Sequence, residues 1–322
     1  GLEQLRYAWR SGQFELNILT RLADLYLEEG RFEDGLVRLR LASNLFPDEA
    51  RELRLNLKMQ TVFRDLFLGQ DAEKLTPFKA ISLFRRFQEF TPPGVDGDTM
   101  IRRLSDRLVA VDLLPQAADL LDYQVRERLE GIARAQIASN LAKIYILDQQ
   151  GEKALEILRA TREPLLPDDV QRERSHVEAR ALAELGRYEE AEILLDSDRS
   201  FEAEKIRADI LWGAREYGRI IPSLERLLGD NWRSGISLDE RGRYNLMRLT
   251  LAQTFLQDSA ALSELRQKYG REMQDGDFST SFQLLTNAEE LSGRELGVIA
   301  EQIASVEKLQ SFLRDYRSDF NG

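Results

Sequence analysis

The chain has 322 residues, 45 of them basic and 56 acidic, with a single histidine and no cysteine. The net charge of −11, with acids interleaved among bases, argues against duplex nucleic acid and anionic membranes as partners. Without cysteine the chain has no disulfides, thiolate metal sites or cysteine nucleophiles. Its apolar runs are too short to span a bilayer, and no signal peptide is visible. Because the sequence opens without Met and inside a helical pattern, we expect it to be a fragment of a longer protein.

The first predicted helical pair lies within residues 22–47. Here, as along almost the whole chain, apolar residues recur at spacings of three and four, the period of a helix, and strand patterns are nearly absent. The small residues Ala23 and Gly35 are expected to face each other where the two helices cross, because only small side chains allow close approach. Gly30 is expected to end the first helix in the left-handed conformation. Pro47 is expected to stop the second helix.

An expanded helical pair is predicted next, at 48–68 and 77–90, and the segment Thr91–Gly94 then breaks the array. Further pairs are predicted within 104–121, 141–158, 179–195 and 208–224. The tail, 237–320, keeps the helical period but loses the pattern of the pairs. Its long last helix, near 294–316, is expected to be a cap or a surface for a neighbour.

Three of these pairs, within 22–47, 141–158 and 179–195, share one internal spacing. Each has a small residue, a large one three later, a turn residue four after that, a small one five later and a large one four later. This spacing resembles the tetratricopeptide repeat, over about two thirds of the chain. The resemblance implies an all-α, right-handed α-solenoid of helix-turn-helix repeats with roughly fourteen to seventeen helices. We expect N-terminal repeats at 1–91, central repeats at 92–236 and a divergent C-terminal region or cap at 237–322, in one continuous solenoid.

The sequence offers no pattern typical of catalysis or metal binding. His176 is the only histidine, so histidine metal clusters are excluded and any Ser–His–Asp triad would have to use it. We expect a surface or groove histidine without a catalytic role, the alternative being a ligand contact or a pH-sensitive contact. Asp96–Asp98 and Asp275–Asp277 lack the further acids of a calcium loop, so Asp98 and Asp277 are expected to be helix N-caps. We predict no enzymatic activity, no cofactor and no metal.

The resemblance places a concave binding groove along the first helices of the pairs. The matching positions of the central repeats combine basic, aliphatic and aromatic side chains. The partner-binding residues that it implies are Gln136, Ser139, Asn140, Lys143, Ile146, Leu147, His176, Arg180, Lys205, Asp209 and Trp212, with Glu173 and Glu202 at further groove positions. Such a mixture suits an extended or helical peptide with some acidic character. The alternatives are that Trp212 packs against the next repeat and that Lys143 and Arg180 are ordinary solvated charges.

Two functions stay open at this point. The first is a non-catalytic scaffold that binds a peptide or protein partner within a multiprotein assembly. The Arg- and Leu-rich acidic repeats resemble long repeat regions of bacterial cell-envelope proteins, which favours the periplasm over the cytoplasm. The second is an accessory repeat domain that positions the catalytic domain of a larger enzyme. A groove that binds oligosaccharide or RNA is a third hypothesis with little support in the sequence.

Overall fold

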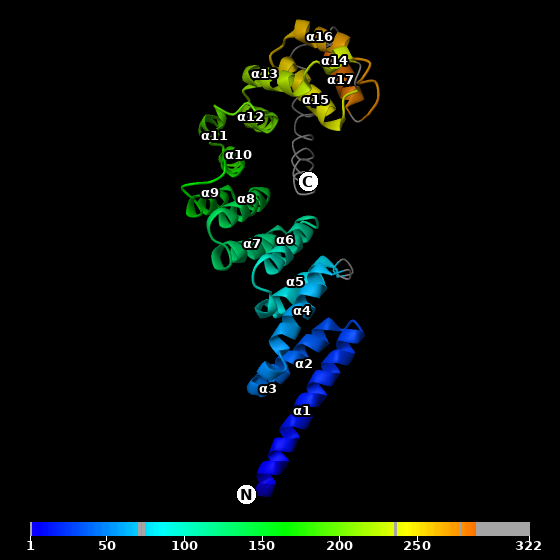
Figure 1. The fold of residues 1–322 in the computed structure, drawn as a ribbon. Helices are drawn as coiled ribbons and strands as arrows, with labels where there is room; N and C mark the ends of the chain where they lie inside the picture. Colours follow the sequence, from blue (N-terminus) through cyan, green and yellow to red (C-terminus); the bar gives the residue numbers. More distant parts are fainter. Residues whose placement is uncertain (1, 70–71, 73–74, 235–236, 277, 288–322) are drawn as a thin grey trace. The chain divides into compact units, whose positions relative to one another are not determined.

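The computed structural model describes residues 2–69, 72, 75–234, 237–276 and 278–287, and in these the chain is built from helices without strands. The chain divides into two compact units, unit 1 (residues 1–130) and unit 2 (residues 131–322). In each unit the helices follow one another along the chain (Figure 1). The all-α fold expected from the sequence is therefore confirmed, whereas the predicted segment boundaries after residues 91 and 236 stay predictions.

Unit 1 begins with the first predicted pair and continues through the expanded one. Its helices are α1 (Leu2–Glu28), α2 (Phe32–Leu45), α3 (Pro47–Glu52), α4 (Leu55–Leu68), α5 (Pro77–Arg86), the 3-10 helix η2 (Gln88–Phe90), α6 (Val95–Val109) and α7 (Leu114–Glu127). Helix α1 packs against α2, α2 against α4, α4 against α6, and α6 against α7.

The predicted crossing of the first pair is present. Gly35 lies so close to α1 that a β-carbon there would be 2.7 Å from the Leu27 side chain and 3.2 Å from the Ala23 carbonyl oxygen. Gly30 follows α1 with a φ of 73°, the left-handed conformation that glycine tolerates. Pro47 lies beyond the end of α2 and begins α3. The close approach and both helix ends are therefore confirmed.

An aromatic cluster holds α4, α5 and η2 together. Phe63 packs edge-on against Phe67 with ring centroids 4.9 Å apart, and Phe84 lies 5.9 Å from both rings. Phe87 stacks on Phe90 at 6.0 Å. These rings fill the core of the expanded pair, where the repeat spacing is lost.

Two details of the predicted elements are different in the structure. The single helix expected at 48–68 is two helices, α3 and α4, because Arg54 between them has a left-handed φ of 50°. The expectation that Asp98 is an N-cap is wrong. Helix α6 begins after Gly94, and the Asp98 carboxylate instead accepts a hydrogen bond from Arg128 Nε at 2.9 Å. Asp277 and the helix expected near 294–316 lie outside the described residues.

Unit 2 contains the more regular pairs. Its helices are α8 (Gly131–Leu147), α9 (Gly151–Ala160), α10 (Asp168–Glu184), α11 (Tyr188–Leu195), α12 (Phe201–Gly213), α13 (Tyr217–Leu228), α14 (Asn231–Ser234), α15 (Glu240–Phe255), α16 (Ser259–Tyr269) and α17 (Ser279–Thr286). Helix α10 packs against α8 and α9, α12 against α10 and α11, and α15 against α13. Each pair therefore stacks on the pair before it, as in a helical solenoid.

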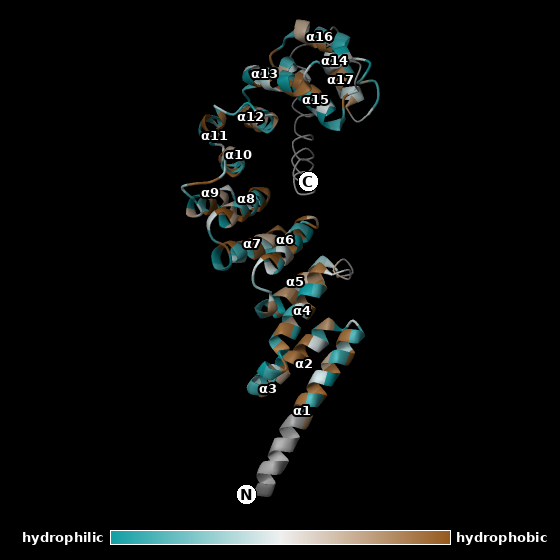
Figure 2. Cartoon of the chain, in the orientation of Figure 1, coloured by the Kyte–Doolittle hydropathy of each residue, from teal (hydrophilic) through white to brown (hydrophobic). Residues whose placement is uncertain are grey.

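The hydrophobic core of unit 2 continues beyond the last recognisable repeat. One buried cluster joins Leu224 of α13, Leu246 of α15, Leu265 of α16 and Phe282 of α17. Hydrophobic and hydrophilic stretches alternate along the helices, as expected for helices with one buried and one exposed side (Figure 2). The first part of the divergent tail thus packs as an integral part of unit 2.

Candidate functional site

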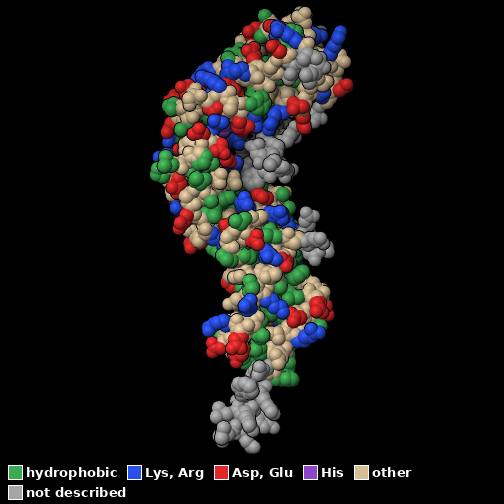
Figure 3. Space-filling view, viewed as in Figure 1, with side chains coloured by type: hydrophobic (Ala, Val, Ile, Leu, Met, Phe, Trp, Pro, Cys, Tyr) green, Lys and Arg blue, Asp and Glu red, His purple; other side chains and the backbone are tan. Residues whose placement is uncertain are grey.

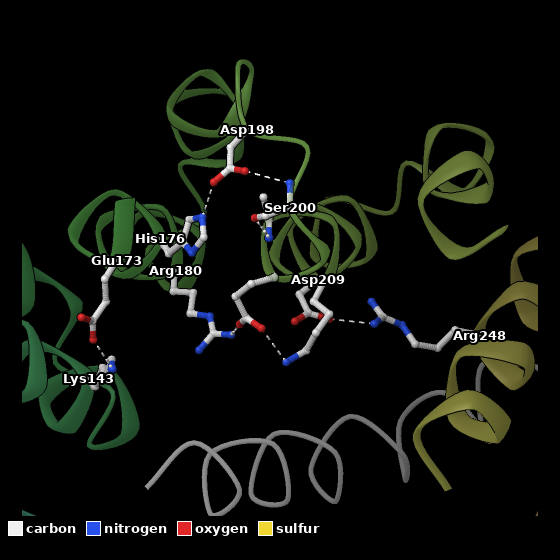
Figure 4. A network of polar contacts seen from close by, with 11 residues as sticks. Lys143, Glu173, His176, Arg180, Asp198, Ser200, Asp209 and Arg248 are labelled. Carbon is white, nitrogen blue, oxygen red and sulfur yellow. Dashed lines mark hydrogen bonds and ion pairs between the residues drawn. The ribbon is translucent and has the colours of Figure 1, made fainter. Parts of the chain in front are cut away.

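A row of ion pairs connects the first helices of successive pairs in unit 2 (Figure 4). The ion-pair row, as we call it, consists of Lys143–Glu173, Arg180–Glu202–Lys205 and Asp209–Arg248. The nitrogen–oxygen distances are 2.7 Å from α8 to α10, 2.7 Å from α10 to α12, 3.0 Å within α12, and 2.7 Å from α12 to α15. The row therefore brings together residues that are up to 105 positions apart in sequence (248 − 143) on four helices.

Helix register explains the position of the row. Lys143, Arg180 and Asp209 each come directly after the alanine that the repeat spacing places where the first helix crosses the second helix of the same pair. One residue further along a helix is a rotation of about 100°. A side chain at this position therefore points away from the second helix of its own pair. It points toward the first helix of the next pair, where its ion-pair partner lies.

The acids of the row are more exposed than its bases. The side-chain exposures are 43% for Glu173, 40% for Glu202 and 53% for Asp209, but 20% for Lys143, 27% for Arg180, 7% for Lys205 and 4% for Arg248. Arg248 also donates to the carbonyl oxygen of Ala208 at 2.8 Å. The row thus presents carboxylates outward and keeps its bases beneath them.

The other predicted residues of α8 differ in how accessible they are. Ser139 is buried, and its hydroxyl donates to the Ala135 carbonyl oxygen at 3.1 Å. Ile146 is buried as well, whereas Gln136 is exposed and Leu147 is half-buried, like Asn140. Of the predicted residues on this helix, only the last three, together with Lys143, offer surface to another molecule.

His176 joins α10 to the connection between α11 and α12. Its Nε2 lies 2.8 Å from the carboxylate of Asp198, which also accepts the backbone N–H of Ser200 at 2.8 Å. Burial alone would raise the pKa of Asp198, but the hydrogen bonds from Ser200 and His176 outweigh it and lower that pKa from 3.8 to about 2. Figure 4 shows His176 turned toward Asp198, while Arg180 is turned toward the next link of the row.

Trp212 is half-buried and packs against the helices that follow it in unit 2. Its ring lies 5.6 Å from that of Tyr217, and the Arg248 guanidinium lies 5.2 Å from its centroid. It contacts the buried cluster of α12 to α17. Of the two roles considered for Trp212, this arrangement favours packing against the next helices.

Two buried arginines that sequence reasoning missed attach α10 and α12 to the helices before them. Arg174 donates to the carbonyl oxygens of Ala135 and Leu158, both at 2.6 Å. Arg207 donates to the carbonyl oxygen of Leu195 at 2.8 Å. Burial lowers the pKa of Arg174. The available signal was an arginine at a position where other first helices carry an aliphatic residue, such as Ile137 or Leu141.

Ion pairs also join helices of unit 1, among them Lys58–Asp24 between α4 and α1 and Arg85–Asp119 between α5 and α7. Among the described residues, no group of three or more histidine or acidic side chains is placed to hold a metal ion. Within the same residues, no helix is both long and apolar enough to cross a membrane. On the face shown in Figure 3, acidic and basic side chains are interspersed and form no large patch of one sign.

Fold and site together define an all-α protein of stacked helical pairs with a row of ion pairs across its first helices. No protein-family model matches the chain, and no curated protein matches it either. Among solved structures, it is similar to the crystal structure of a tetratricopeptide repeat protein from Parabacteroides merdae ATCC 43184. The similarity covers 85% of this chain and 98% of that one, with 12% sequence identity and a TM-score of 0.40.

Proposed function

We propose that the chain is a non-catalytic scaffold that binds a peptide or protein partner within a multiprotein assembly, through the ion-pair row of unit 2. The observation that carries the proposal is the row itself, because an ion pair joins each first helix to the next one. A partner lying across these helices would meet an accessible carboxylate at each step. Extended surfaces of this kind are what stacked helical pairs provide for binding.

The exposure of the row favours a partner with basic side chains. A carboxylate has more acceptor positions than one ion pair uses, so Glu173, Glu202 and Asp209 can each accept a further hydrogen bond. The bases beneath them keep their contacts when such a partner binds. An acidic partner, which the sequence alone favours, would first have to separate Lys143 or Arg180 from its carboxylate.

Affinity capture from extracts of the native organism tests this function. The test variant Glu173→Gln/Glu202→Gln/Asp209→Asn removes the exposed charges and keeps the size of the side chains. The matched control, Glu156→Gln/Glu189→Gln/Glu190→Gln, removes three exposed acids from the second helices α9 and α11. We expect a partner that binds the wild type and the control but not the test variant. A partner retained by all three, and also by the variant Lys143→Glu/Arg180→Glu, would contradict the assignment to the row.

Salt and charge reversal distinguish the two kinds of partner. Binding of a basic segment weakens with salt and is lost when the three carboxylates are neutralised. In contrast, binding of an acidic segment would survive that neutralisation and be lost in Lys143→Glu/Arg180→Glu. This second result would leave the scaffold function in place but reverse the chemistry of its partner.

We place the assembly in the bacterial cell envelope, on the periplasmic side, because the repeats are divergent, acidic and rich in Arg and Leu. The test is immunodetection of the native protein in periplasmic and cytoplasmic fractions of its host. Recovery with a cytoplasmic marker would contradict the location and leave the binding proposal unaffected.

A further inference from the structure

The chain continues beyond α17 from a point close to the ion-pair row. The last described residue is Asn287, directly after α17. Helix α17 packs against α15, and Arg248 of α15 forms the last link of the row with Asp209 of α12. Residues 288–322 therefore begin beside the helix at which the row ends.

The segment after α17 is long enough to reach every carboxylate of the row. From α17 through α15 and α12 to α10 are three steps between neighbouring helices, or about 30 Å at an interaxial distance of about 10 Å. The 26 residues from 288 to 314 (314 − 288) span about 40 Å as a helix. Chain length thus permits a contact between this segment and the whole row.

Residues 299–317 have the sequence pattern of a helix with one packing side. Alternating spacings of four and three connect Ile299, Ile303, Val306, Gln310, Leu313 and Arg317. Arg314 follows Gln310 by four and so falls on the same side, whereas Glu301 and Asp315 fall on the opposite side. The expected packing side is therefore apolar at its start and basic at its end.

Arginines on the packing side of a helix need acidic partners, because a buried charge without a partner is costly. The row offers such partners. Its carboxylates, Glu173, Glu202 and Asp209, have exposed fractions between 40% and 53%. Each has more acceptor positions than one ion pair uses. The charges of the row therefore complement Arg314 and Arg317.

An apolar surface adjoins these carboxylates. Leu147, Ala183 and Trp212 are half-buried, and each lies three or four positions beyond the row residue of α8, α10 or α12. Three or four positions are about one turn of a helix, so these side chains lie on the same side as the row. The first helices of unit 2 thus combine the two kinds of surface that residues 299–317 require.

We propose that residues 299–317 are an internal occupant of the ion-pair row. As a helix lying across the first helices of unit 2, the segment packs its apolar side near Leu147, Ala183 and Trp212, and Arg314 and Arg317 bind the carboxylates. A basic partner then competes with the segment for the same carboxylates, a consequence that rests on the proposed function. Because the segment is part of the chain, its effective concentration at the row is high, and it lowers the apparent affinity for the partner.

Hydrogen exchange of the full chain, followed by mass spectrometry, tests the contact. We expect residues 299–317 to exchange about tenfold or more faster in the test variant Glu173→Gln/Glu202→Gln/Asp209→Asn than in the wild type. The control with three neutralised acids on α9 and α11 should exchange like the wild type. Circular dichroism establishes that the helices of each variant are intact. Equal exchange of 299–317 in the wild type and the test variant would overturn the proposal.

Charge reversal within the segment supplies the second half of the test. Arg314→Glu/Arg317→Glu should accelerate exchange of 299–317 as much as the test variant does, and the two sets of changes combined should add little more. The matched control, Arg294→Glu/Lys308→Glu, reverses two bases that the helical period places on the opposite side, and should leave exchange unchanged. Equal effects of the two reversals would contradict a contact through Arg314 and Arg317.

Affinity capture then tests the competition. Arg314→Glu/Arg317→Glu should capture more of a basic partner than the wild type does, because the carboxylates of the row are no longer occupied. Unchanged capture would contradict the competition. Hydrogen exchange needs no partner, so the two proposals can fail separately. Exchange that depends on the row without any captured partner would contradict only the proposed function, whereas a partner captured through the row while exchange is independent of the row would contradict only the internal occupant.

Discussion

The core of α4, α5 and η2 in unit 1 and the contacts between pairs in unit 2 join helices by different chemistry. In unit 1 the contact is a cluster of phenylalanine rings, with Phe63 and Phe84 fully buried. In unit 2, Arg174 and Arg207 reach back from one pair to the carbonyl oxygens of the pair before it. Burial of apolar surface is non-directional, so it tolerates an irregular pair and a broken helix. A guanidinium must meet carbonyl groups at fixed distances, so each such contact fixes the position of one pair on the pair before it.

Removing a ring from the aromatic cluster should have the largest effect on stability. Phe84→Ala leaves a cavity among Phe63 and Phe67, and we expect a loss of about 3–5 kcal/mol in the free energy of unfolding. Denaturant unfolding followed by circular dichroism measures the loss, and hydrogen exchange with mass spectrometry should place it in unit 1. Phe78→Ala on the same helix is the control, since Phe78 is 68% exposed and its loss should change stability by at most about 0.5 kcal/mol. Equal effects of both changes would show that the cluster does not stabilise unit 1.

Removing a buried arginine should lower the free energy of unfolding by a smaller amount, and the loss should lie in unit 2. Arg174→Met keeps much of the side-chain volume but leaves the Ala135 and Leu158 carbonyl oxygens without their charged donor. We expect a loss of about 2–3 kcal/mol and faster hydrogen exchange in α8 to α10. Arg172→Met is the control, because Arg172 lies two residues away with a side chain that is 57% exposed. If Arg174→Met is as stable as the wild type, the attachment of the pairs in unit 2 rests on apolar packing, as in unit 1.

Acidic pH should lower the stability of unit 2, because the Asp198 carboxylate becomes protonated. The folded protein lowers the pKa of Asp198 from 3.8 to about 2, so the ionised carboxylate stabilises the fold. This stabilisation is complete above the unfolded pKa and is lost as the pH falls from about 4 to about 2. We expect the wild type to exceed Asp198→Asn in unfolding free energy by about 1–2 kcal/mol at neutral pH. Unfolding measured across this pH range should show the difference shrinking toward acid. A difference that does not change with pH would contradict the role of the carboxylate charge.

The sequence predicts the helical pairs well because they depend on local spacing. Ala23, Gly30 and Gly35 determine a crossing and a helix end from positions within one pair, and both are present in the structure. The contacts between pairs are harder to predict, because each depends on two helices whose stacking must be known first. Arg174 looks like an ordinary surface charge in the sequence, and only the stacked structure shows that it is buried.

The candidate site illustrates the same limit. Lys143, Arg180, Lys205 and Asp209 were predicted as binding residues from their positions in the repeat. Arg248, the partner of Asp209, lies in the divergent tail, where the repeat spacing no longer identifies equivalent positions. The carboxylates are more exposed than the bases because of where each side chain begins in the stack of helices and how long it is. The repeat spacing alone does not give this exposure. The exposure changes the expected partner from acidic to basic.

The smallest expected effect is in the ion-pair row itself, and it sharpens the contrast with the buried arginines. In Lys143–Glu173 the acid is 43% exposed, so water and salt screen the attraction. A double-mutant cycle with Lys143→Gln and Glu173→Gln should give a coupling of about 0.2–1 kcal/mol in the free energy of unfolding, falling with added salt. Because so little stability depends on this pair, its charges can be changed in binding experiments without unfolding unit 2. A coupling as large as the effect of Arg174→Met would instead make the row part of the structural framework, and loss of binding in its variants could no longer be assigned to contact with a partner.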